Sequence, residues 1–472
     1  MSDELIRKDA TEIVVALKAG DVTPHDLLDA LEARIGEVDG AVNALPTLCF
    51  DRARKHADGL MALPTSERGQ LAGMPVPIKD LAAVEGVLST MGSPIYADWV
   101  PEESDILVSH LEREGGVIYA KSNTPEFGAG ANTFNEVFGR TLNPWNTSRS
   151  AAGSSGGAAV SLATGMAWVA HGSDMGGSLR NPASFCGIVG MRPSPGRVAT
   201  TRGGKINGFM GVEGPMARTV EDLALLFDAM RGEEAGDPIS LPYDGTSYLK
   251  VARGDWMPKR VAVSRDLGVT PVEPEVAEIV MAAARRFEEA GVIVEEAHPD
   301  LSEAHECFQT LRAVAFATGH DGHYRNNRDQ LKPDVIWNIE QGLKLTAADI
   351  VKAEHQRTAM FNRTRAFFET YDLLLCPATI VSPFPVEQRF VERCDGQDFG
   401  NYVEWLAIAY AITNVACPAL SIPAGFTAEE LPVGIQVVGP PRGDAQAIRG
   451  AKVLEDILGL KGSTPMDPRV VS

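Results

Sequence analysis

"SRSAAGSSGGAAV", residues 148–160, contains a tight Gly/Ser run. A flexible linker, a phosphate-binding loop and a catalytic centre can each contain such a run. The residues that follow it are small and apolar, and such side chains let helix and sheet backbones pack closely, which argues against a solvated linker. No Lys-Ser or Lys-Thr follows the glycines, so the run lacks the residues that a P-loop requires.

The run also satisfies the pattern G-x-S-x-G, which would make Ser155 the nucleophile of a strand-to-helix elbow. Such an elbow needs a buried strand immediately before it. Residues 143–152, "NPWNTSRSAA", are polar and contain a proline, which predicts a loop instead. The elbow is therefore the weaker interpretation.

A second glycine–serine cluster, "VAHGSDMGGSLRNPASFCGIVG", occupies residues 169–190. We predict a buried strand over 168–171, a tight loop over 172–177, and a helix with Pro182 in its first turn. Successive backbone N–H groups of such a loop point into one concavity, which suits an anion or a developing oxyanion. Ser178 lies at the mouth of the loop. The simpler interpretation is a structural turn, and His171 is interpreted as a structural hydrogen-bonding residue.

Lys79 ends a short apolar stretch in "GMPVPIKDL", residues 73–81. A lysine at the end of a strand is usually a solvated charge. If Lys79 is instead buried against the Gly/Ser loops, desolvation disfavours its ammonium form. To act as a base near neutral pH, its pKa has to fall from about 10.4 by roughly 3 units.

Together, "GMPVPIKD" (73–80), "AGSSGGAAVSLATG" (152–165) and "HGSDMGGSLRNPASFCGIVGMRPSPGRV" (171–198) resemble the amidase signature family of amide hydrolases. The resemblance covers nearly the whole chain and is poor over about 230–400. It implies a Ser–cis-Ser–Lys triad with Lys79 as base, Ser154 as proton relay and Ser178 as nucleophile. The other roles that it implies are an oxyanion hole of Met175, Gly176, Gly177 and Ser178 backbone N–H groups, substrate binding at Gly128 and Ser154, and supporting roles for Ser155, Asp174 and Arg180. The peptide bond before Ser154 is expected to be cis.

The function that the resemblance implies is hydrolysis of a small carboxylic amide to an acid plus ammonia or amine through a Ser178 acyl-enzyme. The scheme uses no metal and no organic cofactor. One alternative is the glutaminase (A) subunit of a tRNA-dependent amidotransferase, and another is a non-catalytic binding protein on the same scaffold. Arg357, Arg363 and Arg365 would suit a docking surface, but their spacing is typical of a solvated helix face.

Short apolar runs alternate with helical stretches, which predicts an α/β fold. We expect one large domain over 1–472, with a mixed, mostly parallel central sheet covered by helices on both faces. Within it we expect an N-terminal helical segment (1–65), a catalytic signature core (70–230), a variable substrate-selecting region (231–400) and C-terminal strands that complete the sheet (401–460). Residues 317–330 and Trp337 are candidates for a wall of the acyl or amine pocket, but the favoured interpretation of 317–330 is a polar surface loop.

The chain has 472 residues and a formal net charge of −20 at pH 7. This acidic balance argues against nucleic acid and anionic membranes as partners, because both require basic patches. The six cysteines lie far apart, the N-terminus lacks a signal-peptide core, and no apolar run is long enough to span a membrane. A cytoplasmic enzyme is therefore expected. The family resemblance adds the homodimer, which is common among its members.

Overall fold

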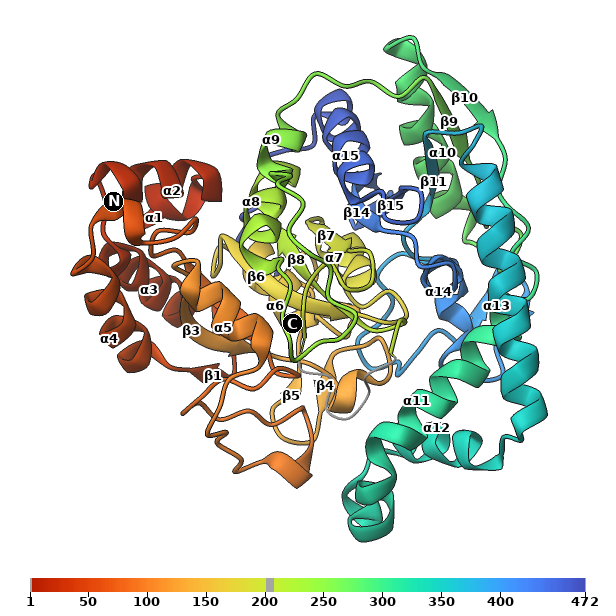
Figure 1. Ribbon diagram of the computed structural model, residues 1–472, viewed down its shortest axis with the longest axis horizontal. Helices are drawn as coiled ribbons and strands as arrows, with labels where there is room; N and C mark the ends of the chain where they lie inside the picture. The colour runs from red at the N-terminus through yellow and green to blue at the C-terminus, as the bar shows by residue number, and fades with distance from the viewer. Residues whose placement is uncertain (1, 201–207, 472) are drawn as a thin grey trace.

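The structure of the protein is a computed structural model that describes residues 2–200 and 208–471 (Figure 1). The α-helices within these residues are α1 (Ser2–Arg7), α2 (Ala10–Ala19), α3 (Pro24–Val42), α4 (Phe50–Met61), α5 (Ile106–Arg113), α6 (Gly156–Ala163), α7 (Arg180–Cys186), α8 (Val220–Met230), α9 (Tyr248–Ala252), α10 (Pro274–Glu289), α11 (Ala304–Asn326), α12 (Pro333–Lys344), α13 (Ala347–Phe367), α14 (Ala407–Asn414) and α15 (Asp444–Leu458). The strands are β1 (Thr47–Leu48), β2 (Pro75–Lys79), β3 (Val117–Ser122), β4 (Phe134–Asn135), β5 (Gly139–Arg140), β6 (Val169–Asp174), β7 (Val189–Arg192), β8 (Val212–Ala217), β9 (Arg260–Val263), β10 (Ile293–Glu296), β11 (Leu373–Pro377), β12 (Arg393–Cys394), β13 (Gln397–Asp398), β14 (Ala419–Phe426) and β15 (Pro432–Val438).

Within the described residues, the central sheet has eight strands in the order β10-β9-β11-β15-β14-β7-β8-β6. The predicted mixed sheet is confirmed, but the prediction that it is mostly parallel is wrong. Only the β10–β9 and β9–β11 pairs are parallel, and the other five pairs are antiparallel. The alternation of strands and helices in the sequence suggests crossover connections throughout. However, the short turn between β14 and β15 makes a hairpin, and a hairpin needs no crossover helix.

Helices cover both faces of the sheet, as predicted. On one face, the Ser184 hydroxyl of α7 accepts a hydrogen bond from the Gly434 N–H of β15, and Gln436, two residues further on, contacts α14 through the Ile408 carbonyl. On the opposite face, a Cβ atom on Gly450 of α15 would lie 2.3 Å from Leu373 Cδ1 of β11. Side chains alternate between the two faces of a sheet along each strand. Because helices cover both faces, every residue of β11 and β15 is buried, and nearly all of these residues are apolar.

The N-terminal helices α1–α4 lie on one side of the molecule, and α11–α13 lie on the opposite side (Figure 1). Strand β2 forms a separate small sheet with β3 and β1. The two sheets meet where the Lys79 N–H of β2 donates to His171 Nδ1 of β6, at 3.3 Å. This junction places the end of β2 beside the Gly/Ser motifs.

Two predicted elements need correction. Strand β6 continues to Asp174, so the loop predicted for 172–177 begins only at Met175. The interpretation of 317–330 as a surface loop is wrong, because α11 runs through Asn326. Its apolar stripe at Phe308 and Phe316 continues at helical spacing through His320, whose ring lies 4.3 Å from that of Phe127. This ring contact packs the part of α11 that contains its two glycines against the segment that follows β3.

Candidate active site

Lys79, at the end of β2, is fully buried, as the triad interpretation requires. Its Nζ atom lies 2.8 Å from Ser154 Oγ, 2.9 Å from Ser155 Oγ and 2.9 Å from Ser173 Oγ. The structure therefore brings two of the three predicted triad residues into direct contact. Three hydroxyl groups can each accept or donate a hydrogen bond, so they accommodate both protonation states of the amine.

Burial lowers the pKa of Lys79 to about 7, against the opposing influence of Glu213 and Asp174. No carboxylate of the described residues forms an ion pair with its amine, because the nearest polar atoms all belong to serines. Lys121, on the adjacent strand β3, is buried to the same extent, but its Nζ lies 2.8 Å from Asp80. The lysine that lacks a carboxylate partner is thus the one suited to act as a base at neutral pH.

The Gly/Ser run leads directly into α6, with Ser155 as the residue before the first helical turn. The Gly153–Ser154 peptide bond is cis, as predicted. The glycines that follow permit close approach, because a Cβ atom on Gly156 would lie 2.2 Å from Thr133 Oγ1 and one on Gly157 would lie 2.3 Å from the Asn123 nitrogen. The run is therefore a buried turn that holds Ser154 and Ser155 against Lys79.

Asp174, the last residue of β6, organises the loop that leads to α7. Its carboxylate accepts hydrogen bonds from the Gly177 and Leu179 N–H groups and from the buried Arg180 guanidinium. Burial by itself would raise the pKa of Asp174, but Arg180 and Arg192 outweigh it and hold the pKa well below its usual range. Arg180 also donates to the Ala409 carbonyl of α14 at 2.8 Å, so the loop is anchored to a segment near the far end of the chain.

Ser178, the predicted nucleophile, is half-buried at the end of this loop. Its carbonyl oxygen accepts a hydrogen bond from the Ser155 N–H at 3.2 Å, which joins the two glycine–serine clusters. Among the described residues, the structure shows no hydrogen bond between the Ser178 and Ser154 hydroxyl groups. Catalytic hydrogen bonds are often long before a substrate binds, so this arrangement is compatible with a nucleophilic Ser178.

The four predicted oxyanion-hole residues are not equivalent in the structure. The N–H of Gly177 is occupied by Asp174 Oδ1 at 3.0 Å. The adjacent Gly176 faces α11, because a Cβ atom added there would lie 3.4 Å from Phe308 Cζ. The Gly177 N–H therefore stabilises the conformation of the loop, and α11 covers the loop at Gly176.

Gly128, a predicted substrate-binding residue, lies beside Ser154. It has a φ of +72°, and a Cβ atom there would lie 3.3 Å from Ser154 Oγ. A larger residue would therefore crowd the relay serine, which agrees with a position bordering the reacting group.

The sequence interpretation misses several residues of this site. Ser173 contacts Lys79, and His171 connects Lys79 to Glu213, whose carboxylate lies 2.7 Å from His171 Nε2. The period of two along β6 is the signal that could have identified Ser173, because it lies on the same face of the strand as His171. Phe308 and Arg312 on α11 have no such signal, since they lie more than a hundred residues from the motifs.

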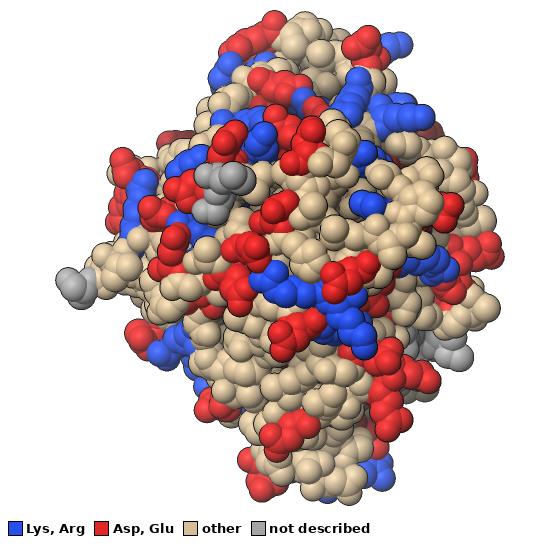
Figure 2. Space-filling view, turned by 90° about the vertical axis from the view of Figure 1, so that its left-hand side faces the viewer, with Lys and Arg blue, Asp and Glu red and all other residues tan. Residues whose placement is uncertain are grey.

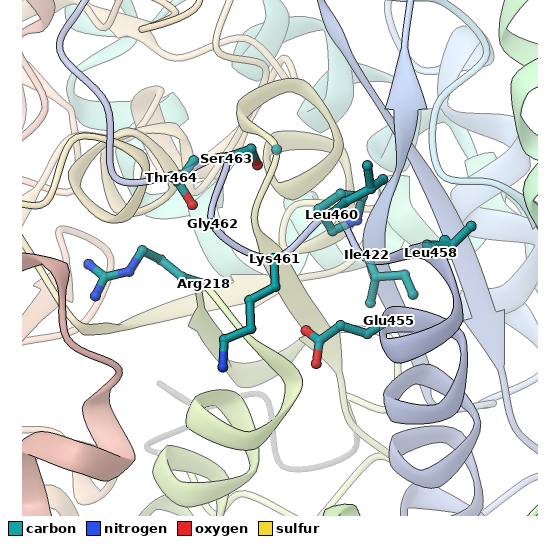
Figure 3. A pocket seen from close by; sticks show the side chains of 11 residues that line it. Arg218, Ile422, Glu455, Leu458, Leu460, Lys461, Gly462, Ser463 and Thr464 are labelled. Carbon is teal, nitrogen blue, oxygen red and sulfur yellow. The ribbon is translucent and has the colours of Figure 1, made fainter.

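No helix of residues 2–200 and 208–471 is both long and apolar enough to cross a membrane, and these residues contain no cluster of metal-ligating side chains. On the face drawn in Figure 2, acidic and basic side chains are interspersed. Figure 3 shows a pocket built from the end of α15 and the segment that follows it, with Arg218, Glu455 and Lys461 among its lining residues. None of the predicted site residues lines this pocket.

Known proteins resemble this chain in both sequence and structure. A family model described as "Amidase" matches residues 26–448. An acylamidase from Rhodococcus erythropolis is 33% identical over 471 residues, which cover 98% of each chain. The A subunit of the glutamyl-tRNA(Gln) amidotransferase from Moorella thermoacetica is 33% identical over 478 residues, which cover 96% of this chain and 97% of that one. The crystal structure of a bacterial aryl acylamidase of the amidase signature family aligns with a TM-score of 0.88 and 26% identity, covering 97% of this chain and 99% of that one. The chain therefore belongs to the amidase signature family.

Proposed function

We propose that this protein hydrolyses a carboxylic amide through an acyl-enzyme on Ser178, with Lys79 as base and Ser154 as proton relay. The observation that carries the proposal is the buried Lys79 amine, which lies 2.8 Å from Ser154 Oγ and has a pKa lowered to about 7. Family membership supports amide hydrolysis as the reaction class.

In the acylation half-reaction, the neutral Lys79 amine accepts the Ser154 hydroxyl proton while Ser154 accepts the proton of Ser178. The Ser178 oxygen attacks the amide carbonyl carbon, and the backbone N–H groups of Met175, Gly176 and Ser178 stabilise the oxyanion, because the Gly177 N–H is bonded to Asp174. The proton then returns through Ser154 to the leaving nitrogen, the C–N bond breaks, and ammonia or an amine departs. The acyl group remains as an ester on Ser178.

In the deacylation half-reaction, water takes the position of the leaving amine. Lys79 and Ser154 remove a proton from it, the resulting oxygen attacks the ester carbonyl, and the acid is released as Ser178 regains its proton. Asp174 and Arg180 hold the loop in place, and Gly128 leaves room beside Ser154. In this scheme, all catalytic groups belong to this chain, and water is the second substrate.

The experiment is amide turnover by Lys79→Ala, Ser154→Ala, Ser178→Ala and Ser155→Ala. We expect kcat/KM to fall by at least about 10³-fold in each of the first three variants. Lys79, Ser154 and Ser178 act in one proton relay, so the loss of any one of them interrupts the whole relay. Ser155 also contacts Lys79, at 2.9 Å, but it is outside the proposed relay, so Ser155→Ala should lose less than Ser154→Ala. Near-wild-type activity of Ser178→Ala would overturn the proposal.

The names of the acylamidase relative and of the aryl acylamidase structure favour acyl amides, aryl ones among them, as substrates. A screen from aliphatic primary amides through anilides to short peptide amides tests this preference. We expect α11, from the region over 231–400, to help select among them, because Phe308 covers Gly176 of the loop.

A second candidate is the glutaminase subunit of a tRNA-dependent amidotransferase, which several relatives at 28–33% identity favour. Both candidates share the same chemistry and differ in substrate and assembly. Ammonia release from glutamine that requires a co-purifying partner would support the amidotransferase subunit. Efficient hydrolysis of simple amides by the isolated chain would support the amidase.

A further inference from the structure

Arg312, in the middle of α11, is a buried cation, with only 6% of its surface exposed. Its Nη2 donates to the Tyr402 hydroxyl at 2.9 Å, and its Nη1 lies 3.4 Å from Met175 Sδ. The guanidinium also lies over the Phe316 ring, 4.3 Å from its centroid. Thioether sulfur is a weak acceptor, so among the described residues Tyr402 is the only strong acceptor in contact with this guanidinium.

No carboxylate of the described residues forms an ion pair with Arg312, and its Nε is buried without a hydrogen-bond partner. Every Asp and Glu side chain of the chain lies within the described residues, because 201–207 reads "TRGGKIN". Arg180, by contrast, is a fully buried arginine that faces Asp174 at 2.9 Å. A buried charge that lacks an opposite charge is costly to the fold, and a ligand anion would supply what is missing.

Arg312 is also close to the proposed reacting groups. Met175, which it contacts, begins the loop whose N–H groups are proposed to hold the oxyanion. One helical turn before Arg312, Phe308 lies against Gly176 of the same loop. The guanidinium is thus held beside the loop by an apolar stripe of α11.

Tyr402 completes a set of donors at this position. Its hydroxyl oxygen accepts hydrogen bonds from both Arg312 and the buried Asn338, so its own proton is available to a further acceptor. A planar guanidinium and a hydroxyl together suit a carboxylate, which accepts several hydrogen bonds at once. The net charge of −20 does not oppose this, because a local arginine can reverse the potential within one site.

We propose that Arg312 binds a carboxylate of the substrate, so that the preferred substrates are amides that also carry an anionic group. This inference rests on the proposed amide hydrolysis for its position in the reaction, but the binding itself does not depend on turnover. The anionic group can belong to the acyl part or to the leaving amine, and the experiment distinguishes these two sides.

The test uses two matched substrate pairs. For the acyl side, the monoamides of C4–C6 dicarboxylic acids are compared with their methyl esters, and release of ammonia is measured. For the amine side, 4-acetamidobenzoate is compared with its methyl ester, and release of the arylamine is measured. We expect kcat/KM of the wild type to favour the carboxylate over the ester by at least 10-fold in one of the two pairs.

In that pair, Arg312→Gln should lower kcat/KM for the carboxylate by at least 10-fold, mainly through KM, and change it less than 3-fold for the ester. Arg312→Lys should retain an intermediate preference. Arg325→Gln is the matched control, because Arg325 is an exposed residue of the same helix paired with Asp321. Equal losses for carboxylate and ester would overturn the inference, as would a wild-type preference for the ester in both pairs.

Binding to Ser178→Ala, measured by calorimetry, separates this inference from the proposed function. We expect Ser178→Ala to bind the carboxylate amide at least 10-fold more tightly than the ester, and the double variant with Arg312→Gln to lose this difference. If this binding difference appears while the wild type shows no turnover, the proposed function fails and the role of Arg312 stands. If turnover proceeds and the binding difference is absent, the role of Arg312 fails alone.

Discussion

At the scale of single residues, Lys79 and Lys121 are both buried lysines, but they differ in the groups that contact their amines. Both are fully buried on adjacent strands, and burial lowers the pKa of both. Lys121 is paired with Asp80, which favours its charged form, whereas Lys79 is surrounded by serine hydroxyl groups. The partner, and not the burial, decides which lysine is structural and which can accept a proton.

The pH dependence of activity follows from this contrast. If neutral Lys79 is the base, kcat/KM should rise with pH through an apparent pKa near 7 and level off above it. Glu213 favours the charged form of Lys79, so Glu213→Gln should shift the rise to lower pH. Glu221→Gln, at a surface ion pair with Arg253, serves as control and should leave the profile in place. A rise that moves to higher pH in Glu213→Gln would contradict this account.

Stability should also depend on Lys79. Because burial lowers its pKa from 10.5 to about 7, the unfolded state binds more protons than the folded state between these pH values. Burial of Lys79 therefore lowers the free energy of unfolding by its full amount below pH 7, and by less as the pH rises towards 10.5. Lys79→Met removes this pH-dependent loss of stability. The free energy of unfolding of the variant minus that of the wild type should therefore fall by about 3 kcal/mol between pH 7 and 9.5, because the wild type gains stability over this range. Urea unfolding at both pH values measures the change, and a pH-independent difference would count against a neutral Lys79.

The sequence could single out Lys79, Ser154 and Ser178 as candidate residues because each belongs to a local motif with a fixed order. Ser173 was missed, although it contacts Lys79 as closely as Ser155 does. A strand places every second residue on one face, but which face meets a neighbouring sheet depends on the packing of β2 against β6. Arg312 could not be identified at all, since its position beside Met175 arises only from the folded path of α11.

At the scale of elements, the loop between β6 and α7 is fixed by hydrogen bonds to Asp174 and by the ion pair between Asp174 and Arg180. Asp174 accepts hydrogen bonds from the N–H groups of two loop residues, and Arg180 fixes its carboxylate from the first turn of α7. Gly177 has a φ of +107°, and a Cβ atom there would lie 2.5 Å from Asn181 Oδ1 and 2.7 Å from Ala409 Cβ. The backbone conformation and the close packing at residue 177 therefore both require glycine.

Gly177→Ala should consequently lower both stability and activity. We expect a loss of unfolding free energy of at least about 1–3 kcal/mol from the backbone conformation and the crowding, and a larger loss of kcat/KM. Gly322→Ala on α11 is the matched control, because this exposed helical glycine has open space around its Cα and alanine there should stabilise by up to about 1 kcal/mol. Thermal unfolding and kinetics of both variants test this. Equal stability and activity of the two variants would show that the loop is not constrained.

The elements themselves were largely predictable, while their arrangement was not. The apolar run at 372–380 and the paired runs near the C-terminus became β11, β14 and β15. Periodicity cannot show which strands become neighbours, and so the antiparallel pairs of the central sheet were not anticipated. Likewise, the part of α11 that contains its glycines packs His320 on Phe127, a contact between distant segments that periodicity cannot show.

At the scale of the whole molecule, residues from both ends of the chain build one site. β2 supplies Lys79 from the N-terminal third, the two glycine–serine motifs supply the serines, and α14 anchors the loop through its Ala409 carbonyl. The helices α11–α13 lie on the far side of the molecule from α1–α4 (Figure 1). Of these, α11 supplies Phe308 and Arg312, which contact this loop. We therefore expect the chemistry to depend on the glycine–serine motifs and the choice of substrate to depend on the covering helices.

The central claim is that the reaction passes through an acyl-enzyme on Ser178. The most direct measurement is mass spectrometry of acid-quenched protein during turnover of an anilide, followed by peptide mapping. We predict a mass increase equal to the acyl group less one hydrogen, located on the peptide that contains Ser178, and absent from Ser178→Ala. An adduct on Ser155, or turnover with no adduct together with an active Ser178→Ala variant, would contradict the account.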